Sequence, residues 1–159
     1  MCALKGSPLG DLARIRSVRT RRVSSWDQTG GNDDRLHVQP GETVVLADIA
    51  GAGVINHIWC TIDCQQEHYL RRIVLRMWWD NEEQPSVEVP IGDFFGVGHA
   101  KTANFASLPL QMSPADGKSF NCFFPMPYSE RARIELTSEC DVEVLFYYYI
   151  DYEEHPSMD

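Results

Sequence analysis

Apolar and polar residues alternate along most of this chain, and that period of two restricts its possible folds more than any other feature. The alternation is clearest at residues 43–50, 54–63, 69–80, 131–138 and 141–151. In residues 131–138, Ile134 and Leu136 fall on one face and Arg133 on the other. Because successive side chains of a strand point to opposite faces of a sheet, the pattern predicts strands with one buried face.

Turn-forming residues separate these segments at short intervals. They occur at 40–41, 51–53, 80–83, 114–117 and 139–141, and they are rich in glycine, proline, aspartate and asparagine. Short strands about ten residues apart, without helices between them, favour an all-β antiparallel jelly-roll sandwich. The missing alternation of strands and helices argues against Rossmann and barrel folds.

One segment near the N-terminus has helical spacing instead. Ser7 suits the N-cap and Pro8 the first turn, and Leu9, Leu12 and Ile15 recur at helical intervals. We therefore expect a short helix that ends before residue 19. The expected organisation is an N-terminal helical segment, a jelly-roll domain and a tail, at residues 1–18, 19–154 and 155–159.

Charge and hydropathy exclude several classes of partner. The 159 residues include 23 acidic and 14 basic side chains, which give a formal net charge of −9. An acidic surface repels phosphates, so we expect neither nucleic acid nor a membrane surface as a partner. No stretch approaches the ~18 apolar residues of a spanning helix, and the N-terminus lacks the apolar core of a signal peptide. These observations predict a cytoplasmic location.

The cysteines do not form the pattern of a small disulfide scaffold, because they are odd in number and widely spaced. They are Cys2, Cys60, Cys64, Cys122 and Cys140. The spacing of Cys60, Cys64 and His68 invites a test for zinc, but a structural zinc site needs a second ligand pair that the chain lacks. We expect reduced thiols, no bound metal and no cofactor.

Two loops interrupt the alternation, and the first is residues 24–34. Its Trp26 lies beside Asp27, Asn32, Asp33 and Asp34, around a pair of glycines. Carboxylates and amides bind vicinal hydroxyls and an indole covers the C–H face of a sugar ring, so the loop fits sugar recognition. An Asx-rich turn that bonds its own backbone is an alternative. A calcium site is another, although the spacing differs from that of a twelve-residue calcium loop.

The second loop, residues 90–99, contains glycines, two aromatic residues, an aspartate and a histidine. Phe94 and Phe95 are adjacent, so one is expected in the core while the other lines a cleft. His99 is a candidate proton carrier, because imidazole titrates near neutral pH. Alternatively both rings pack in the core and His99 is an ordinary surface residue. Gly96 and Gly98 do not form a phosphate loop, because no helix is expected after them.

Six blocks of sequence occur in the order found in a known family. They are residues 24–34, 40–43, 46–49, 51–55 with 58–59, 87–96 and 121–128, which include Ser-Ser-Trp-Asp-Gln-Thr-Gly-Gly-Asn-Asp-Asp and Asn-Cys-Phe-Phe-Pro-Met-Pro-Tyr. From about residue 19 to about residue 154 the chain resembles the N-terminal half of glycoside hydrolase family 172, formerly the domain of unknown function numbered 2961.

The resemblance implies an activity on furanosides such as difructose anhydrides, α-D-fructofuranosides or D-arabinofuranosides. It also implies two jelly rolls in one chain, and oligomers with sites near subunit contacts. Retaining glycosidases use two carboxylates about 5 Å apart. In this family both are glutamates of the second half, near segments of Gly-Glu-Gly-Asp and Gly-Thr-Glu-Asp type. No segment of this sequence resembles those motifs, so we assign no catalytic residue to this chain.

Two hypotheses follow for the function. In the first, the chain is one half of a furanoside-acting glycoside hydrolase and becomes active when a second-half chain supplies the glutamates. Its substrate-binding candidates are then Trp26, Asp27, Asn32, Asp33, Asp34, Phe95 and His99. In the second, it is a non-catalytic module for sugar binding or oligomer assembly. Both predict association, either with another copy or with a complementary chain.

Overall fold

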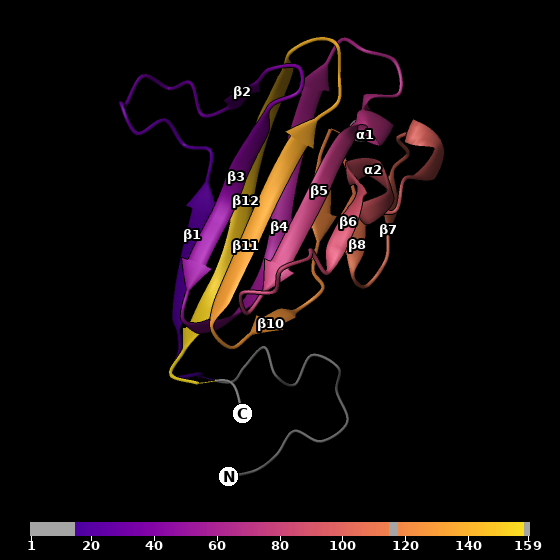
Figure 1. The fold of residues 1–159 in the computed structure, drawn as a ribbon. Helices are drawn as coiled ribbons and strands as arrows, with labels where there is room; N and C mark the ends of the chain where they lie inside the picture. Colours follow the sequence, from indigo (N-terminus) through magenta and orange to yellow (C-terminus); the bar gives the residue numbers. More distant parts are fainter. Residues whose placement is uncertain (1–14, 115–117, 158–159) are drawn as a thin grey trace.

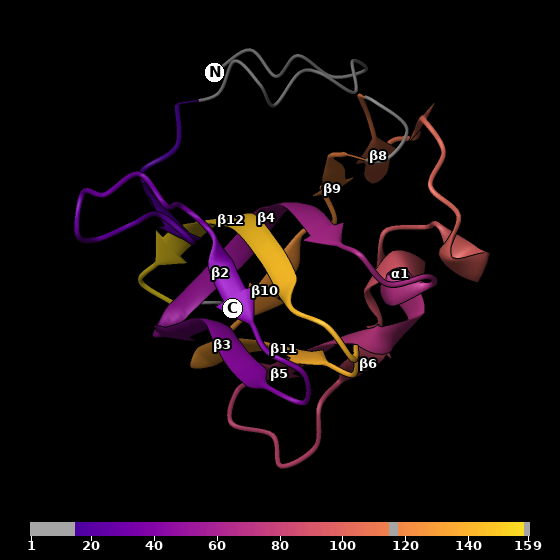
Figure 2. The same cartoon turned by 90° about the horizontal axis from the view of Figure 1, so that it is seen from above.

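The fold is a sandwich of two antiparallel sheets, seen in a computed structural model that describes residues 15–114 and 118–157 (Figures 1 and 2). This confirms the predicted all-β jelly-roll sandwich. The expected N-terminal helix falls mostly outside the described residues, and residues 15–18 have no regular secondary structure. No helix among the described residues has the length and apolar character needed to cross a membrane.

The larger sheet has eight strands and the smaller has four. The larger follows the order β1-β12-β4-β9-β8-β7, with β10 paired to β4 and β2 paired to β12. Its strands are β1 (Arg19–Ser24), β2 (Leu36–Val38), β4 (Ala52–Cys64), β7 (Phe105–Ala106), β8 (Leu110–Met112), β9 (Phe120–Cys122), β10 (Met126–Tyr128) and β12 (Val144–His155). The smaller sheet is formed in order by β3 (Thr43–Ala50), β11 (Arg131–Ser138), β5 (Ile73–Trp79) and β6 (Val87–Pro90).

Three short helices lie together at one flank of the sandwich (Figure 1). They are α1 (Tyr69–Arg72), α2 (Ile91–Phe94) and the 3-10 helix η2 (Gly98–Ala100). The alternation at residues 69–80 predicted one continuous strand, but its first four residues form α1 and the strand begins at Ile73. The helices α1 and α2 approach closely because Gly92 has no side chain: a Cβ there would lie 2.9 Å from Cβ of Leu70.

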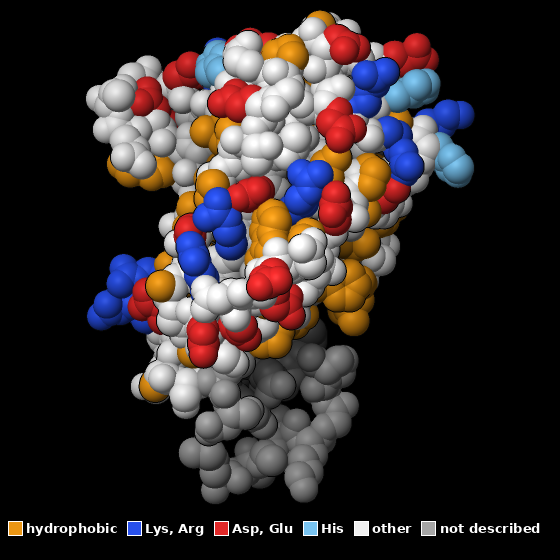
Figure 3. All heavy atoms as spheres, in the orientation of Figure 1, with side chains coloured by type: hydrophobic (Ala, Val, Ile, Leu, Met, Phe, Trp, Pro, Cys, Tyr) orange, Lys and Arg blue, Asp and Glu red, His pale blue; other side chains and the backbone are white. Residues whose placement is uncertain are grey.

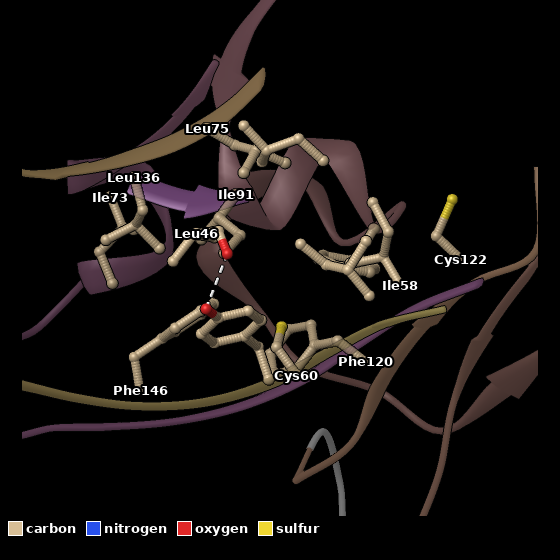
Figure 4. Close-up of a cluster of buried hydrophobic side chains, with 14 of the residues drawn as sticks. Leu46, Ile58, Cys60, Ile73, Leu75, Ile91, Phe120, Cys122, Leu136 and Phe146 are labelled. Carbon is tan, nitrogen blue, oxygen red and sulfur yellow. Dashed lines mark hydrogen bonds between the residues drawn. The ribbon is translucent and has the colours of Figure 1, made fainter. Parts of the chain in front are cut away.

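The core fills the space between the two sheets, as the alternation predicted (Figure 4). On β12, for example, Phe146, Tyr148 and Ile150 are buried, while Tyr149 between them is exposed. The hydroxyl of Tyr148 crosses the core and donates a 2.7 Å hydrogen bond to the carbonyl oxygen of Leu46 on β3. The inward-facing side chains of the strands therefore hold the two sheets together. The outer faces of the sheets and the loops at their ends remain available for other contacts.

Candidate functional site

The loop of residues 24–34 connects β1 to β2, and two carboxylates hold its shape. Oδ1 of Asp27 accepts hydrogen bonds from the N–H and hydroxyl of Thr29, at 2.8 and 2.7 Å. Oδ2 of Asp27 accepts from the N–H of Asp33 at 3.2 Å, and Asp34 accepts from the N–H of Asp27 at 2.8 Å. These bonds, first those from Thr29, lower the pKa of Asp27. Asp27 and Asp34 therefore bond the backbone of their own loop, as the alternative of an Asx-rich turn predicted.

The double glycine and Asn32 are required by the same turn. Gly30 has φ +79°, and Asn32 has φ +65°, a conformation that asparagine tolerates better than most residues. A Cβ on Gly31 would lie 2.7 Å from Oδ2 of Asp27. The glycine pair thus lets the chain reverse closely around the Asp27 carboxylate.

Asp33 takes part in ion pairs beside the loop. Its two oxygens meet Nε of Arg35 at 2.6 Å and Nε2 of His37 at 3.0 Å, and Nδ1 of His37 faces Glu143 at 3.2 Å. The hydrogen bond to Asp33, followed by the one to Glu143, raises the pKa of His37. The pKa of Asp33 is lowered in turn, chiefly by His37. The acids of this loop are therefore already partnered.

Trp26 is the group that the loop offers to a ligand. Its side chain is 59% exposed. The preceding residue anchors it: the Ser25 hydroxyl donates to the carbonyl oxygen of Asp34 at 2.6 Å and accepts from the N–H of Tyr148 on β12 at 3.1 Å. The indole consequently projects from a loop that is tied to the sheet, and an aromatic ring held in this way suits the C–H face of a sugar.

The second loop contributes to an open hollow of about 680 Å³ between α1, α2 and η2. The hollow is lined by His68, Arg71, Asp93, Gly98 and His99. Figure 3 shows basic and histidine side chains gathered on this flank of an otherwise acidic protein. Arg71 donates from Nη1 to Oδ2 of Asp93, which links α1 to α2 across the hollow.

One carboxylate oxygen of Asp93 has no hydrogen-bond donor within the described part of the chain. Its Oδ1 is buried, and no described residue donates a hydrogen bond to it. A buried acceptor without a donor costs about 1–3 kcal/mol, more when the group is charged. Such a group is suited to accept a hydrogen bond from an enclosed water molecule, and it shows that the carboxylate of Asp93 is not fully used by the fold.

The backbone around the hollow is strained at three positions. His68, His99 and Ala100 have φ of +59°, +61° and +54°, a left-handed conformation that non-glycine residues seldom adopt. Each such residue costs of order 1 kcal/mol, and strain of this kind clusters at binding and catalytic sites. Two of the three residues line the hollow itself.

Phe95 does not line the hollow but is buried in the core, which corrects its assignment to the sugar site. Its ring is 1% exposed and contacts the rings of Phe94 and Phe120 edge-on, with centroids 5.0 and 5.6 Å apart. Of the two adjacent rings, Phe95 is therefore the core anchor, and Phe94 is the half-buried one. Buried Phe95 supports α2 but offers no surface to a ligand.

His68 and Arg71 line the hollow although their sequence pattern did not indicate it. Arg71 was placed on a strand, and His68 was considered only together with Cys60 and Cys64. Cys60 is buried in the core, and Cys64 lies beside Cys140, whose thiol pKa burial raises to about 11. Within the described residues no three His, Cys, Asp or Glu side chains are arranged to hold a metal ion.

The two loops lie on opposite flanks of the sandwich, in both views of the ribbon (Figures 1 and 2). Trp26 and its loop follow β1, whereas His99 and Asp93 belong to the group of short helices. The structure therefore does not bring Trp26 and His99 together within one chain.

Comparison with known proteins assigns the family. A family model described as GH172 domain-like matches residues 29–145, which is most of the chain. The chain belongs to this family. It is accordingly a domain of the GH172 type, with the sandwich fold described above.

Other comparisons give no closer identification. No curated protein matches. Two matching solved structures are the VP2 subviral particle of infectious bursal disease virus, with 8% identity and a TM-score of 0.47, and the Gx strain of that virus, with 10% identity and a TM-score of 0.42. The matches cover 88% and 91% of this chain but 33% and 34% of the viral chains, so this chain spans about one third of their length.

Proposed function

We propose that this domain is the N-terminal jelly roll of a furanoside-acting glycoside hydrolase and that it binds substrate without supplying the catalytic carboxylates. The open hollow lined by Asp93, whose Oδ1 has no donor among the described residues, carries the proposal. Membership of the GH172 family supplies the class of ligand. The hydroxyl groups of a furanoside are hydrogen-bond donors, which this carboxylate lacks at one oxygen within the described chain.

In this proposal a vicinal pair of hydroxyls binds across the hollow. The first donates to the carboxylate of Asp93, while Arg71 holds Oδ2 and keeps the side chain oriented. The second hydroxyl meets a ring nitrogen of His99 or His68 at the rim. Hydrogen bonds to a charged group are worth about 1.5–3 kcal/mol, so this contact discriminates strongly against a deoxy sugar.

Trp26 contributes to the same ligand only through assembly. Because its loop lies on the flank opposite the hollow, one sugar contacts both when two copies adjoin. Trp26 and Asn32 then meet the sugar, and Asp27, Asp33 and Asp34 keep the loop in shape through the bonds described above. This arrangement also accounts for the association that both sequence hypotheses predict.

The bond-breaking groups come from a second jelly roll in this proposal. Cleavage through an oxocarbenium-like state with retention needs two carboxylates about 5 Å apart. The test mixes this domain with a second-half chain that carries the two glutamate motifs and measures release of an aryl leaving group from α-D-fructofuranosides and D-arabinofuranosides. We expect cleavage by the mixture and none by either chain by itself. Asp93→Asn should reduce the rate of cleavage by the mixture. No cleavage of any furanoside by the mixture would contradict the proposal.

A non-catalytic sugar-binding module is the second candidate, and the exposed indole of Trp26 favours it. Calorimetric titration of the domain alone with fructose and arabinose oligomers distinguishes the two. Binding that Trp26→Ala abolishes, with no turnover by the complemented mixture, supports the module. Turnover by the mixture supports the hydrolase.

A further inference from the structure

A closed network of side chains covers the outer face of the larger sheet, on the side away from the core. Its polar part begins on β1, where Arg22 donates from Nε and Nη2 to the two carboxylate oxygens of Asp151 on β12, at 2.5 and 3.0 Å. Oδ2 of Asp151 meets Nδ1 of His57 on β4 at 3.2 Å. Nε2 of His57 then meets Oδ1 of Asn121 on β9 at 3.1 Å. Four neighbouring strands are thus linked in order.

The network returns to β1 through aromatic rings. Both the carboxamide of Asn121 and the indole N–H of Trp59 donate to the hydroxyl of Ser119, at 3.1 and 2.8 Å. The Trp59 ring stacks on Tyr149, with centroids 4.7 Å apart, and the Arg22 guanidinium lies 4.4 Å from the Tyr149 ring centroid. Each side chain is therefore held by two neighbours.

One further ring extends this face outward. Phe123 stacks on His57 with centroids 4.6 Å apart and an interplanar angle of 4°. Its side chain is 42% exposed, although it follows directly after a strand whose other residues are buried or half-buried. The face turned away from His57 is a flat apolar surface beside the polar network.

A hollow of about 570 Å³ adjoins the network where the strand register shifts. Asp151 pairs with His57 but Tyr152 pairs with Ile55, so Asn56 is the extra residue of a β-bulge. Asn56, Arg22, Asp151 and Thr20 line the hollow. Bulges often lie next to binding sites because they redirect side chains.

We propose that this outer face is a second carbohydrate-binding site, separate from the hollow at Asp93. A sugar ring stacks its C–H face on Phe123, and neighbouring units direct hydroxyls toward Asp151, Arg22 and Asn56. The four linked strands span roughly 14 Å at about 4.8 Å per strand, which is longer than a single ring. The ligand is therefore an oligosaccharide.

The character of the face favours a saccharide over a macromolecule. A stable protein interface buries about 800 Å² per partner around an apolar centre, whereas the centre of this face holds a carboxylate, a guanidinium and an imidazole that are costly to dehydrate. The net charge of −9 opposes a nucleic acid. A hydrated sugar keeps these groups wet, and side chains that are already fixed lose little freedom on binding.

Affinity electrophoresis of the domain through gels containing arabinan, inulin, xylan or glucan tests the proposal. At least one polysaccharide should retard the wild type, and Phe123→Ala should weaken its binding at least about tenfold. Leu108→Ala, at another exposed apolar residue, should leave retardation unchanged. Phe123→Ala should also weaken retardation when it is added to an Asp93→Asn variant, and that result separates this site from the proposed hydrolase site.

Nuclear magnetic resonance of the wild type gives a second readout that needs no variant. Titration with oligosaccharides of the retarding polymer should shift the indole N–H signal of Trp59, while that of Trp78 on the other sheet stays in place. Absence of retardation in every gel would overturn the proposal. A Phe123→Ala variant that binds like the wild type, or one that loses self-association while binding is unchanged, would overturn it as well.

Discussion

Replacing Asp93 by asparagine should weaken sugar binding without weakening the fold. The substitution keeps the shape of the side chain but removes its charge. In the free domain Oδ2 is paired with Arg71, and Oδ1 is buried without a donor among the described residues. The two atoms therefore contribute to stability with opposite signs.

The magnitudes follow from exposure and pairing. The side chains of Arg71 and Asp93 are 48% and 31% exposed, and an ion pair this open is worth about 0.2–1 kcal/mol. A buried acceptor without a donor costs about 1–3 kcal/mol, and a neutral amide costs less than a carboxylate. The free energy of unfolding should therefore change by less than about 1 kcal/mol. Loss of a charge-assisted bond to a ligand should raise its Kd about 10- to 100-fold.

Urea unfolding and calorimetric titration with furanosides measure the two effects on the same protein. The matched control is Asp80→Asn, because Oδ1 of Asp80 accepts three backbone N–H bonds, from residues 129, 130 and 131. That control should lower the urea midpoint and leave the Kd unchanged. If Asp93→Asn instead destabilised the domain by more than about 2 kcal/mol and bound sugar normally, Asp93 would be a structural residue and the reasoning would be refuted.

Three further predictions concern other parts of the molecule. Trp26→Ala should raise the Kd for furanosides at least about tenfold with an unchanged urea midpoint, since the exposed indole adds little to the core; normal binding would remove Trp26 from the site. Gly53→Ala should destabilise the fold by about 3 kcal/mol in urea unfolding, because its Cβ would lie 2.5 Å from a backbone oxygen, and Gly98→Ala, in open space, is the control that should change little. Burial raises the pKa of Tyr148 from 10.0 to about 12, so above pH 10 the unfolded state loses a proton that the folded state keeps, and stability should fall by roughly 2–3 kcal/mol between pH 10 and 12. Tyr148→Phe should reduce that fall in urea titrations at each pH, and an unchanged fall would exclude Tyr148 as its source.

The strands that border the core were predictable from alternation alone. β3 and β11 have the predicted bounds, residues 43–50 and 131–138. Alternate residues of β11 face inward as expected, whereas β3 buries the adjacent Leu46 and Ala47 where the register of the two strands shifts. β1 was missed because Arg19–Ser24 is a polar strand at the edge of its sheet. It pairs with β12 and forms cross-strand ion pairs such as Arg22 with Asp151, so no apolar period marks it.

The candidate site was predictable in place but not in detail. Both loops were singled out from their composition, yet hydrogen bonding within the first loop occupies Asp27 and Asp34, and the second loop buries Phe95. Composition specifies which groups a loop contains. Which of them remain free depends on turn geometry and packing, since a carboxylate near backbone N–H groups binds them first.

Local pattern was enough to specify the faces of the strands and the family of the domain, because a period of two and a run of motifs are properties of consecutive residues. The rest depends on the tertiary structure, which places His68, Arg71 and Asp93 around one hollow. It also links four strands through Arg22, Asp151, His57 and Asn121. Asp93 follows Arg71 by 22 residues and meets it because α1 packs on α2, whereas the four members of the network meet because sheet register and strand order bring them side by side. Register and order arise from long-range pairing, which no short stretch of sequence encodes.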